Sequence, residues 1–334
     1  MLSIKHYKPI IVALLLLISK GVICAEIIIK FSHIATSDSP KGLAAAHFKQ
    51  LAEKLTKGKV RIDLYPDGQL FKDNEELEAL QLNSVQILAP SFSKFSSLGI
   101  HDFEVFDLPY LFRNDDDLHR ITQGPVGRGL LALLEPQGII GLGFWDNGFK
   151  NMSANTPIHT PADMRKLKMR IQPSKVIATQ MNDLGAIPFS MPFFETYKYL
   201  NNGLIDGTET TPSLFYTLGL TNSQKYLTLT RHGYLGYVII TNKKFWSGLP
   251  AEIRIELIAA TNETSRYANA IAREQNAADL IAIKNSGQTT VIELTDAEKK
   301  LWQDALIPVR KQMESRIGKD LITEITRQLP ASSQ

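Results

Sequence analysis

The stretch Ile27-Ile28-Ile29-Lys30-Phe31-Ser32 is short, apolar and rich in β-branched residues, and it predicts a buried strand. Pro40, which follows Ser39, is a good first residue of a helix. Apolar side chains recur at helical spacing from there to Thr56, and Gly58 ends the helix. A strand followed directly by a helix is the first unit expected of an α/β fold.

The next residues repeat this alternation of strand and helix. Residues 60–65 alternate as a strand, and Asp73 or Asn74 can cap a helix that runs to about Leu82. Residues 85–88 form a further predicted strand. The order strand, helix, strand, helix, strand predicts an α/β domain with a largely parallel sheet.

A second α/β unit follows without a Pro/Ser-rich linker. We predict strands at residues 138–145, 167–172, 204–206, 234–241 and 289–293, and helices at 174–184, 193–201, 250–285 and from 296 onward. The helix that starts at Pro250 is unusually long for a compact domain. The sequence therefore predicts two lobes joined by crossing strands and by this long helix.

The N-terminal residues have the features of an export signal. The chain of 334 residues has a net charge of +3, and Lys5, Lys8 and Lys20 account for all of it. Between them, residues 10–18 are apolar, but as a helix they span only about 13 Å of a bilayer core of roughly 30 Å. We expect a signal peptide at residues 1–25, cleaved after Ala25 or Cys24. The alternatives are a membrane anchor, which would need a longer apolar run, and a lipoprotein, which would need a small residue before Cys24.

The chain from Glu26 onward contains 34 basic and 34 acidic residues and no cysteine. Its formal neutrality removes the compositional case for binding nucleic acid or an anionic membrane surface. No later segment has 18 consecutive apolar residues, so we expect no membrane insertion of the mature chain. A chain of this length can bury an ordinary core without disulfides.

Motifs of catalysis and metal binding are missing from the sequence. It contains no H-E-x-x-H, no P-loop and no G-x-S-x-G, and the glycines at 124–129 and 138–143 are in the wrong order for a dinucleotide site. We therefore expect no catalytic residue, no metal and no cofactor. A hydrolase built from dispersed Ser, His and Asp residues is the alternative that motifs alone leave open.

One strand presents groups that suit an acidic ligand. Period two places Lys168, Arg170 and Gln172 on the same face of the strand at 167–172. Arg170 lies near the C-terminal end of that strand, where open α/β sheets bind ligands, and a guanidinium pairs bidentately with a carboxylate. On spacing alone, the commoner interpretation is a solvated face of an edge strand.

Three further segments carry polar groups near predicted strand or helix ends. Trp145, Asn147 and Lys150 supply an aromatic ring, an amide and an ammonium, residues 206–213 supply hydroxyls, and Lys41 lies at a helix N-terminus. Each has an ordinary structural interpretation as a turn, a capped loop or a solvated lysine. Their shared placement after strands favours an anion site.

The sequence contains a series of short motifs that occur in the same order in a known family. Because of these motifs, the chain resembles the periplasmic solute receptors of tripartite ATP-independent periplasmic (TRAP) transporters, and among these the DctP-type receptors for four-carbon dicarboxylates. The resemblance covers essentially the whole mature chain. The motifs are Phe31-Ser32-His33, Pro40-Lys41-Gly42, Leu64-Tyr65-Pro66, Gln69-Leu70, Ala89-Pro90-Ser91, Phe106-Asp107-Leu108-Pro109-Tyr110-Leu111-Phe112, Trp145-Asp146-Asn147-Gly148, Leu167-Lys168-Met169-Arg170, Asp206-Gly207-Thr208-Glu209, His232-Gly233-Tyr234 and Asn242-Lys243-Lys244-Phe245-Trp246.

The resemblance implies an α/β periplasmic binding protein of class II-like architecture, with a cleft between two lobes and a long helix spanning both. The first lobe would comprise residues 26–148 and about 235–277, and the second 149–234 and about 278–334. The implied function is periplasmic: the protein binds an organic acid anion, in first place malate, succinate or fumarate, and delivers it to the subunits of a TRAP membrane permease. We expect a monomer.

The resemblance also implies roles for individual residues. Arg170 would hold a substrate carboxylate by a bidentate salt bridge. The same cleft would be lined by Asn147, Lys150, Phe193 and Thr210, with further contacts from Lys41, Ser91 and Trp145. Thr210 departs from the family pattern, which usually has asparagine there, and this bears on which acid is bound.

Three alternatives stay open at this point. The same receptor role could serve another carboxylate, namely a monocarboxylate, a keto acid, a sugar acid or an aromatic acid. An exported enzyme that acts on such acids is a different class. A sensory partner that reports the ligand to a membrane kinase is compatible with the receptor role.

Overall fold

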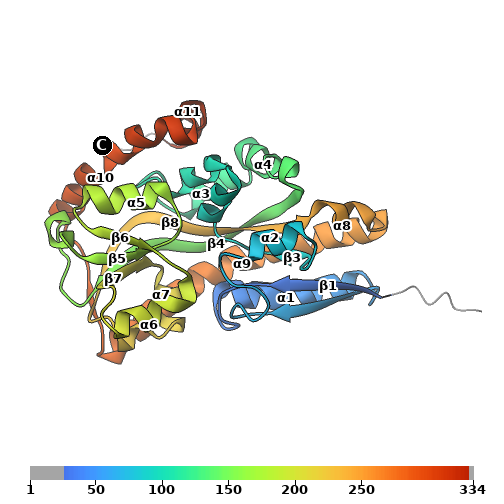
Figure 1. Cartoon of the computed structure of the whole chain (residues 1–334), viewed down its shortest axis with the longest axis horizontal. Coiled ribbons are helices and arrows are strands. Elements are labelled where there is room, and N and C mark those ends of the chain that lie inside the picture. The colour runs from blue at the N-terminus through green and yellow to red at the C-terminus, as the bar shows by residue number, and fades with distance from the viewer. Residues whose placement is uncertain (1–25, 331–334) are drawn as a thin grey trace, which may run out of the picture.

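The computed structural model describes residues 26–330 (Figure 1). The predicted signal peptide, with Cys24, lies outside the described residues. Among those described, nine strands form one sheet in the order β2-β1-β3-β8-β4-β7-β5-β6, with β9 beside β8. No helix in residues 26–330 is long and apolar enough to cross a membrane.

The first lobe follows the predicted alternation closely. It contains β1 (Ile27–Ser32), α1 (Pro40–Leu55), β2 (Val60–Tyr65), α2 (Glu76–Gln81) and β3 (Ile87–Leu88). The side chain of Ser39 caps α1 by accepting from the backbone N–H of Gly42. The predicted cap of α2 is wrong: the helix begins at Glu76, because the carboxylate of Asp73 instead accepts hydrogen bonds from Lys94 and from the backbone N–H of Phe193.

Two long antiparallel strands, β4 (Ile139–Ala154) and β8 (Tyr226–Asn242), run through both lobes. The predicted end of a strand at Trp145 is therefore wrong. The turn-like sequence Asp146-Asn147-Gly148 is absorbed as a shift of register between Asp146 and Gly148. Gly148 has φ +144°, and a Cβ there would lie 2.8 Å from the side-chain nitrogen of Asn276, so the position requires glycine.

The second lobe contains β5 (Lys168–Ile171), α5 (Lys175–Asp183), β6 (Ile187–Ser190), α6 (Thr196–Asn201), β7 (Gly207–Thr210), α7 (Pro212–Thr217) and β9 (Thr290–Ile292). Ser174 caps α5 as expected. The strand predicted at 204–206 instead begins at Gly207, where the absence of a Cβ lets β7 pack against the Ser153 carbonyl of β4. Since β5 lies between β7 and β6, it is not an edge strand.

The sheet is mixed, which corrects the expectation of a largely parallel one. Pairs within each lobe, such as β1 with β2 and β5 with β6, are parallel. The pairs that join the lobes through the centre, β3 with β8, β8 with β4 and β4 with β7, are antiparallel. This arrangement follows from the two long strands, which pass through both lobes in opposite directions.

The long helix is confirmed as α9 (Ala251–Ser286), which contacts α1 in the first lobe, α7 in the second and β4 between them. Figure 1 shows α1 and α9 on one side of the central strands, and α3, α5 and α10 on the other. The remaining helices are α3 (Asp115–Thr122), α4 (Pro125–Ala132), α8 (Lys243–Gly248), α10 (Asp296–Ile317) and α11 (Lys319–Gln328), with 3₁₀ segments η1 (Phe92–Leu98), η2 (His101–Asp107), η3 (Glu135–Gln137), η4 (Pro161–Met164), η5 (Phe193–Glu195) and η6 (Leu220–Asn222).

A hydrophobic core lies on each side of the sheet. On the side of α1 and α9, Phe48 and Leu257 pack with Ile239 of β8. On the other side, Phe106 and Trp302 belong to a cluster that continues from η2 to α10. These cores fix the strand ends that carry the polar groups described next.

Candidate functional site

A small cavity of about 20 Å³ lies where the two lobes meet. This space holds about one water molecule, so the lobes must separate before an organic acid can enter. Six of the eight residues predicted for the site line the cavity, namely Lys41, Ser91, Lys150, Arg170, Phe193 and Thr210. The first two come from the first lobe, and the last three from the second.

Arg170 is deeply buried, with 2% of its surface exposed, so the solvated edge face suggested by spacing alone is wrong. Its Nε and Nη2 donate to the carbonyl of Met191, at 3.2 and 3.1 Å. The guanidinium lies 5.5 Å from the centre of the Phe193 ring and forms no ion pair with any described residue. Burial lowers the pKa of Arg170, as expected for a cation held away from water.

Lys41 is the second buried cation of the cavity, with 3% of its surface exposed. Its Nζ donates to the Ala89 carbonyl at 3.1 Å and lies 3.9 Å from the centre of the Tyr237 ring. Within residues 26–330 it forms no ion pair. Burial lowers the pKa of Lys41 to about 8. The commoner interpretation of Lys41, a solvated lysine, is therefore wrong.

Lys150 also lines the cavity, but its charge is already matched. Its Nζ lies 3.2 Å from a carboxylate oxygen of Asp107 and 3.0 Å from one of Glu209. Glu209 in turn lies 3.3 Å from Nε2 of His232, and all four side chains are buried. Burial alone would lower the pKa of Lys150, but the two carboxylates outweigh it and raise that pKa. Lys150 is thus already paired with these two carboxylates, so it offers a ligand no free positive charge.

Ser91 and Thr210 supply hydroxyls to the cavity. Ser91 precedes η1, and its Oγ accepts a hydrogen bond from Nε2 of Gln172 at 3.0 Å. Thr210 ends β7 and pairs with Asn151 of β4 in the sheet. Gln172 was noted in the sequence only for sharing a strand face with Arg170, and that shared face is the signal by which it could have been assigned to the site. Nothing in the pattern of β8 pointed to Tyr237.

Trp145 and Asn147 do not line the cavity that holds Arg170, which corrects their predicted placement. The ring of Trp145 packs against Phe31 in the core, and its Nε1 donates to Ser265 at 3.2 Å. The Oδ1 of Asn147 accepts from the hydroxyl of Thr211 at 2.5 Å. The physical reason is that β4 continues past Trp145, so the expected turn does not carry these side chains into the cleft.

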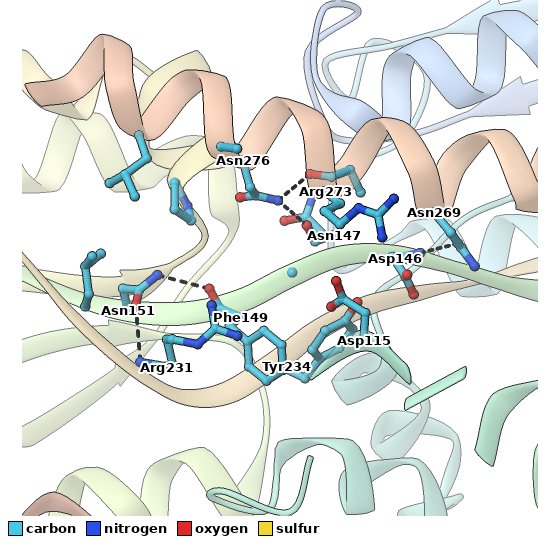
Figure 2. Close-up of a pocket in the computed structure, with 16 residues that line it drawn as sticks. Asp115, Asp146, Asn147, Phe149, Asn151, Arg231, Tyr234, Asn269, Arg273 and Asn276 are labelled. Atoms are coloured by element: carbon cyan, nitrogen blue, oxygen red, sulfur yellow. Dashed lines mark hydrogen bonds between the residues drawn. The ribbon is translucent and has the colours of Figure 1, made fainter. Parts of the chain in front are cut away.

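Asn147 lines a second, larger cavity of about 310 Å³ between β4, β8 and α9 (Figure 2). Charges of both signs face it, including Asp115, Arg231 and Arg273. Asp146 at its edge lies 2.5 Å from Nε2 of His119. Both cavities thus carry mixed charge, but Arg231 and Arg273 are exposed to solvent, whereas Lys41 and Arg170 of the smaller cavity are buried without an ion pair to any described residue. The smaller cavity therefore gains more from a bound dianion. Within residues 26–330, no group of three acidic, His or Cys side chains is placed to hold a metal ion.

The family model for bacterial extracellular solute-binding proteins of family 7, named DctP, matches residues 31–316. The chain belongs to this family. A curated relative of this family 7 protein is the C4-dicarboxylate-binding periplasmic protein DctP of Rhodobacter capsulatus, 52% identical over 313 residues, which are 94% of each chain. The family predicted from the sequence motifs is confirmed.

Solved structures place the family 7 protein in the two-lobed fold of TRAP solute-binding proteins. One is a TRAP periplasmic solute-binding protein from Shewanella oneidensis with bound succinate, with a TM-score of 0.89 and 39% identity over 91% of this chain and 99% of that one. Another is the sugar acid binding protein DctPAm from Advenella mimigardefordensis with galactonate, with a TM-score of 0.88 and 30% identity over 91% and 97%. The predicted fold class is thereby confirmed.

Proposed function

We propose that this protein is a periplasmic receptor that binds a C4-dicarboxylate, such as malate, succinate or fumarate, and delivers it to a TRAP membrane permease. The observation that carries the proposal is the presence of two buried cations, Arg170 and Lys41, in one interlobe cavity, neither of them paired with a carboxylate in the described part of the chain. The Rhodobacter relative named for C4-dicarboxylate binding and the Shewanella structure with succinate support the choice of ligand.

Arg170 is the anchor for one carboxylate. Its guanidinium has five N–H groups, and the Met191 carbonyl occupies the edge formed by Nε and Nη2. The edge formed by Nη1 and the second N–H of Nη2 stays available for a bidentate pair. The bond to Met191 thus fixes the plane of the guanidinium before the ligand arrives.

Lys41 is the anchor for the other carboxylate, in preference to Lys150. The ammonium of Lys150 already faces Asp107 and Glu209, so it offers a second carboxylate little net attraction. Apolar groups from Phe193, Leu214 and Leu235 surround the space between the anchors and suit the methylene carbons of the acid. A dianion that touches both lobes binds the closed arrangement better than the open one and shifts the population toward closure.

The proposed receptor is exported and works outside the cytoplasm. Residues 1–25 act as the export signal, and the receptor works in the periplasm as a monomer. We propose that residues 26–148 and about 235–277 form the first lobe, and residues 149–234 and about 278–334 the second. The receptor releases its ligand to the permease chemically unaltered, without acting as an enzyme.

A ligand panel tests the proposal. Succinate, malate, fumarate, butyrate and galactonate are added separately to the purified mature chain, and the melting temperature is followed, since a ligand that binds only the folded state raises it. We expect the C4-dicarboxylates to raise it most, and NMR to recover them unchanged. A rise with galactonate alone contradicts the choice of ligand, and conversion of the acid contradicts the receptor role.

A further inference from the structure

The turn from Met191 to Phe193 is held by hydrogen bonds to both lobes. On one side, Arg170 of β5 donates to the Met191 carbonyl. On the other, the carboxylate of Asp73, in the loop before α2, accepts from the backbone N–H of Phe193 at 3.3 Å. This turn therefore connects the ligand anchor of the second lobe to a carboxylate of the first.

Asp73 is itself held firmly in the first lobe. Only 8% of its side chain is exposed. The Nζ of Lys94 forms an ion pair with its carboxylate and donates to its backbone carbonyl at 2.9 Å. The same Nζ lies 2.5 Å from the carboxylate of Glu76. Burial alone would raise the pKa of Asp73, but the charge of Lys94 outweighs it and keeps that pKa low, so the acceptor stays ionised.

Other contacts join the same lobes beside this bond. The ammonium of Lys72 lies 5.0 Å from the centre of the Phe194 ring, a cation–π distance. Further along the cleft, Gln172 donates to Ser91. The carboxylate of Glu104 also joins the lobes, by accepting from the backbone N–H of Lys175 at 2.9 Å and from Arg316. The bond of Asp73 differs because its donor, Phe193, lines the cavity and follows Met191, which holds Arg170.

We infer that Asp73 is a positioning residue that latches the closed receptor: by holding the Phe193 amide it keeps the lobes together and fixes the turn that orients Arg170. Asp73 does not line the cavity, so it acts on the ligand through the turn at Phe193 and Met191, and its charge also acts on Arg170 and Lys41. The inference rests on the proposed receptor function. It assigns part of the lifetime of the closed complex to this bond between the two lobes.

The substitution Asp73→Asn changes the charge of this acceptor with little change in shape, and Asp73→Ala removes the acceptor. Both neighbours of the carboxylate, the Lys94 ammonium and the Phe193 N–H, are donors. An amide has a single acceptor oxygen, so it can satisfy only one of them and must turn its NH₂ toward the other. Lys94 keeps Glu76 as a partner, so no uncompensated charge is left in the fold. Glu78→Gln is the matched control. Glu78 is exposed on α2, and its side chain forms no hydrogen bond or ion pair with any of residues 26–330.

Stopped-flow kinetics with succinate test the latch. We expect Asp73→Ala, which leaves the Phe193 N–H without this acceptor, to raise koff about tenfold to a hundredfold, the range for losing one charge-assisted bond, while kon changes less than about twofold. Asp73→Asn should raise koff less, because its amide oxygen can still accept from that N–H. Glu78→Gln should leave both rates unchanged. An unchanged koff in Asp73→Ala, or a loss that falls on kon alone, overturns the latch. Failure of the unmodified protein to bind any dicarboxylate contradicts the proposed function instead.

Hydrogen exchange in the unmodified protein gives a second test that needs no variant. Saturation with succinate should slow exchange of the Phe193 amide, because closure gives this N–H its acceptor. Equal exchange of that amide with and without bound succinate overturns the latch even if Asp73→Ala fails to fold.

Discussion

Lys41 of the first lobe and Arg170 of the second line the same cavity, and neither forms an ion pair with any of residues 26–330. Buried charges without a partner cost several kcal/mol, so proteins rarely retain them without a reason. A ligand with two carboxylates supplies both partners at once. The two cations therefore favour a dianion over an acid with one carboxylate.

Arg170→Ala should weaken succinate binding by roughly thirtyfold to several thousandfold, because truncating one partner of a buried charge pair costs about 2–5 kcal/mol. Calorimetry measures the loss. Arg128→Ala is the control, since Arg128 is exposed on α4, away from the cleft. Equal affinity in Arg170→Ala and the unmodified protein contradicts the role of Arg170.

Succinate affinity should fall as the pH rises above about 8. Burial lowers the pKa of Lys41 to about 8 in the unliganded cavity. A bound carboxylate favours the charged ammonium, so above that pH binding must take up a proton, and affinity falls by up to about tenfold per pH unit. Calorimetry from pH 7 to 9.5 should show this fall in the unmodified protein and a flatter profile in Lys41→Met. An identical slope in both proteins assigns the titration to another group.

Lys150→Met should lower stability more than it changes ligand preference. It leaves Asp107 and Glu209 buried without their cation, a change that typically costs about 3–5 kcal/mol. Denaturant unfolding measures the loss. Adding Asp107→Asn and Glu209→Gln to Lys150→Met should recover part of it, because the uncompensated charges are then removed. No loss of stability in Lys150→Met contradicts the account of this cluster.

Gly148→Ala should destabilise the crossing strand by about 1–3 kcal/mol. The position has φ +144°, which costs an L-residue strain, and the new methyl group would meet the side chain of Asn276 at 2.8 Å. Thermal unfolding measures the effect. Gly129→Ala on α4 is a suitable control, since a Cβ there meets nothing within 4 Å. Equal melting temperatures for the two variants contradict a special conformation at Gly148.

The local elements of this fold were readable from the sequence because short-range patterns determine them. The strand at Ile27, the cap at Ser174 and the long helix after Pro250 follow from β-branching, capping chemistry and helical spacing. Period two also placed Arg170 at the correct end of β5. What failed was the end of the strand at Trp145, because Asp146-Asn147-Gly148 is a local turn signal that pairing with β8 overrides.

Which lysine of the site is paired with carboxylates could not be predicted from the sequence. Lys41 and Lys150 are the same residue type, yet only Lys150 forms ion pairs, with Asp107, 43 residues before it, and Glu209, 59 residues after it. Such pairings depend on how the lobes pack, which no local pattern encodes. The same holds for Asp73, whose carboxylate reaches Phe193 at a separation of 120 residues instead of capping its own helix.

In the proposed receptor, Lys41 receives the second carboxylate of a dicarboxylate that is held by Arg170. The decisive measurement is calorimetry of Lys41→Met with succinate and with butyrate, which has the same chain length but one carboxylate. We predict that succinate binding weakens by roughly thirtyfold or more, while butyrate binding changes by less than about twofold. An equal loss for both acids, or no loss for succinate, contradicts this role of Lys41.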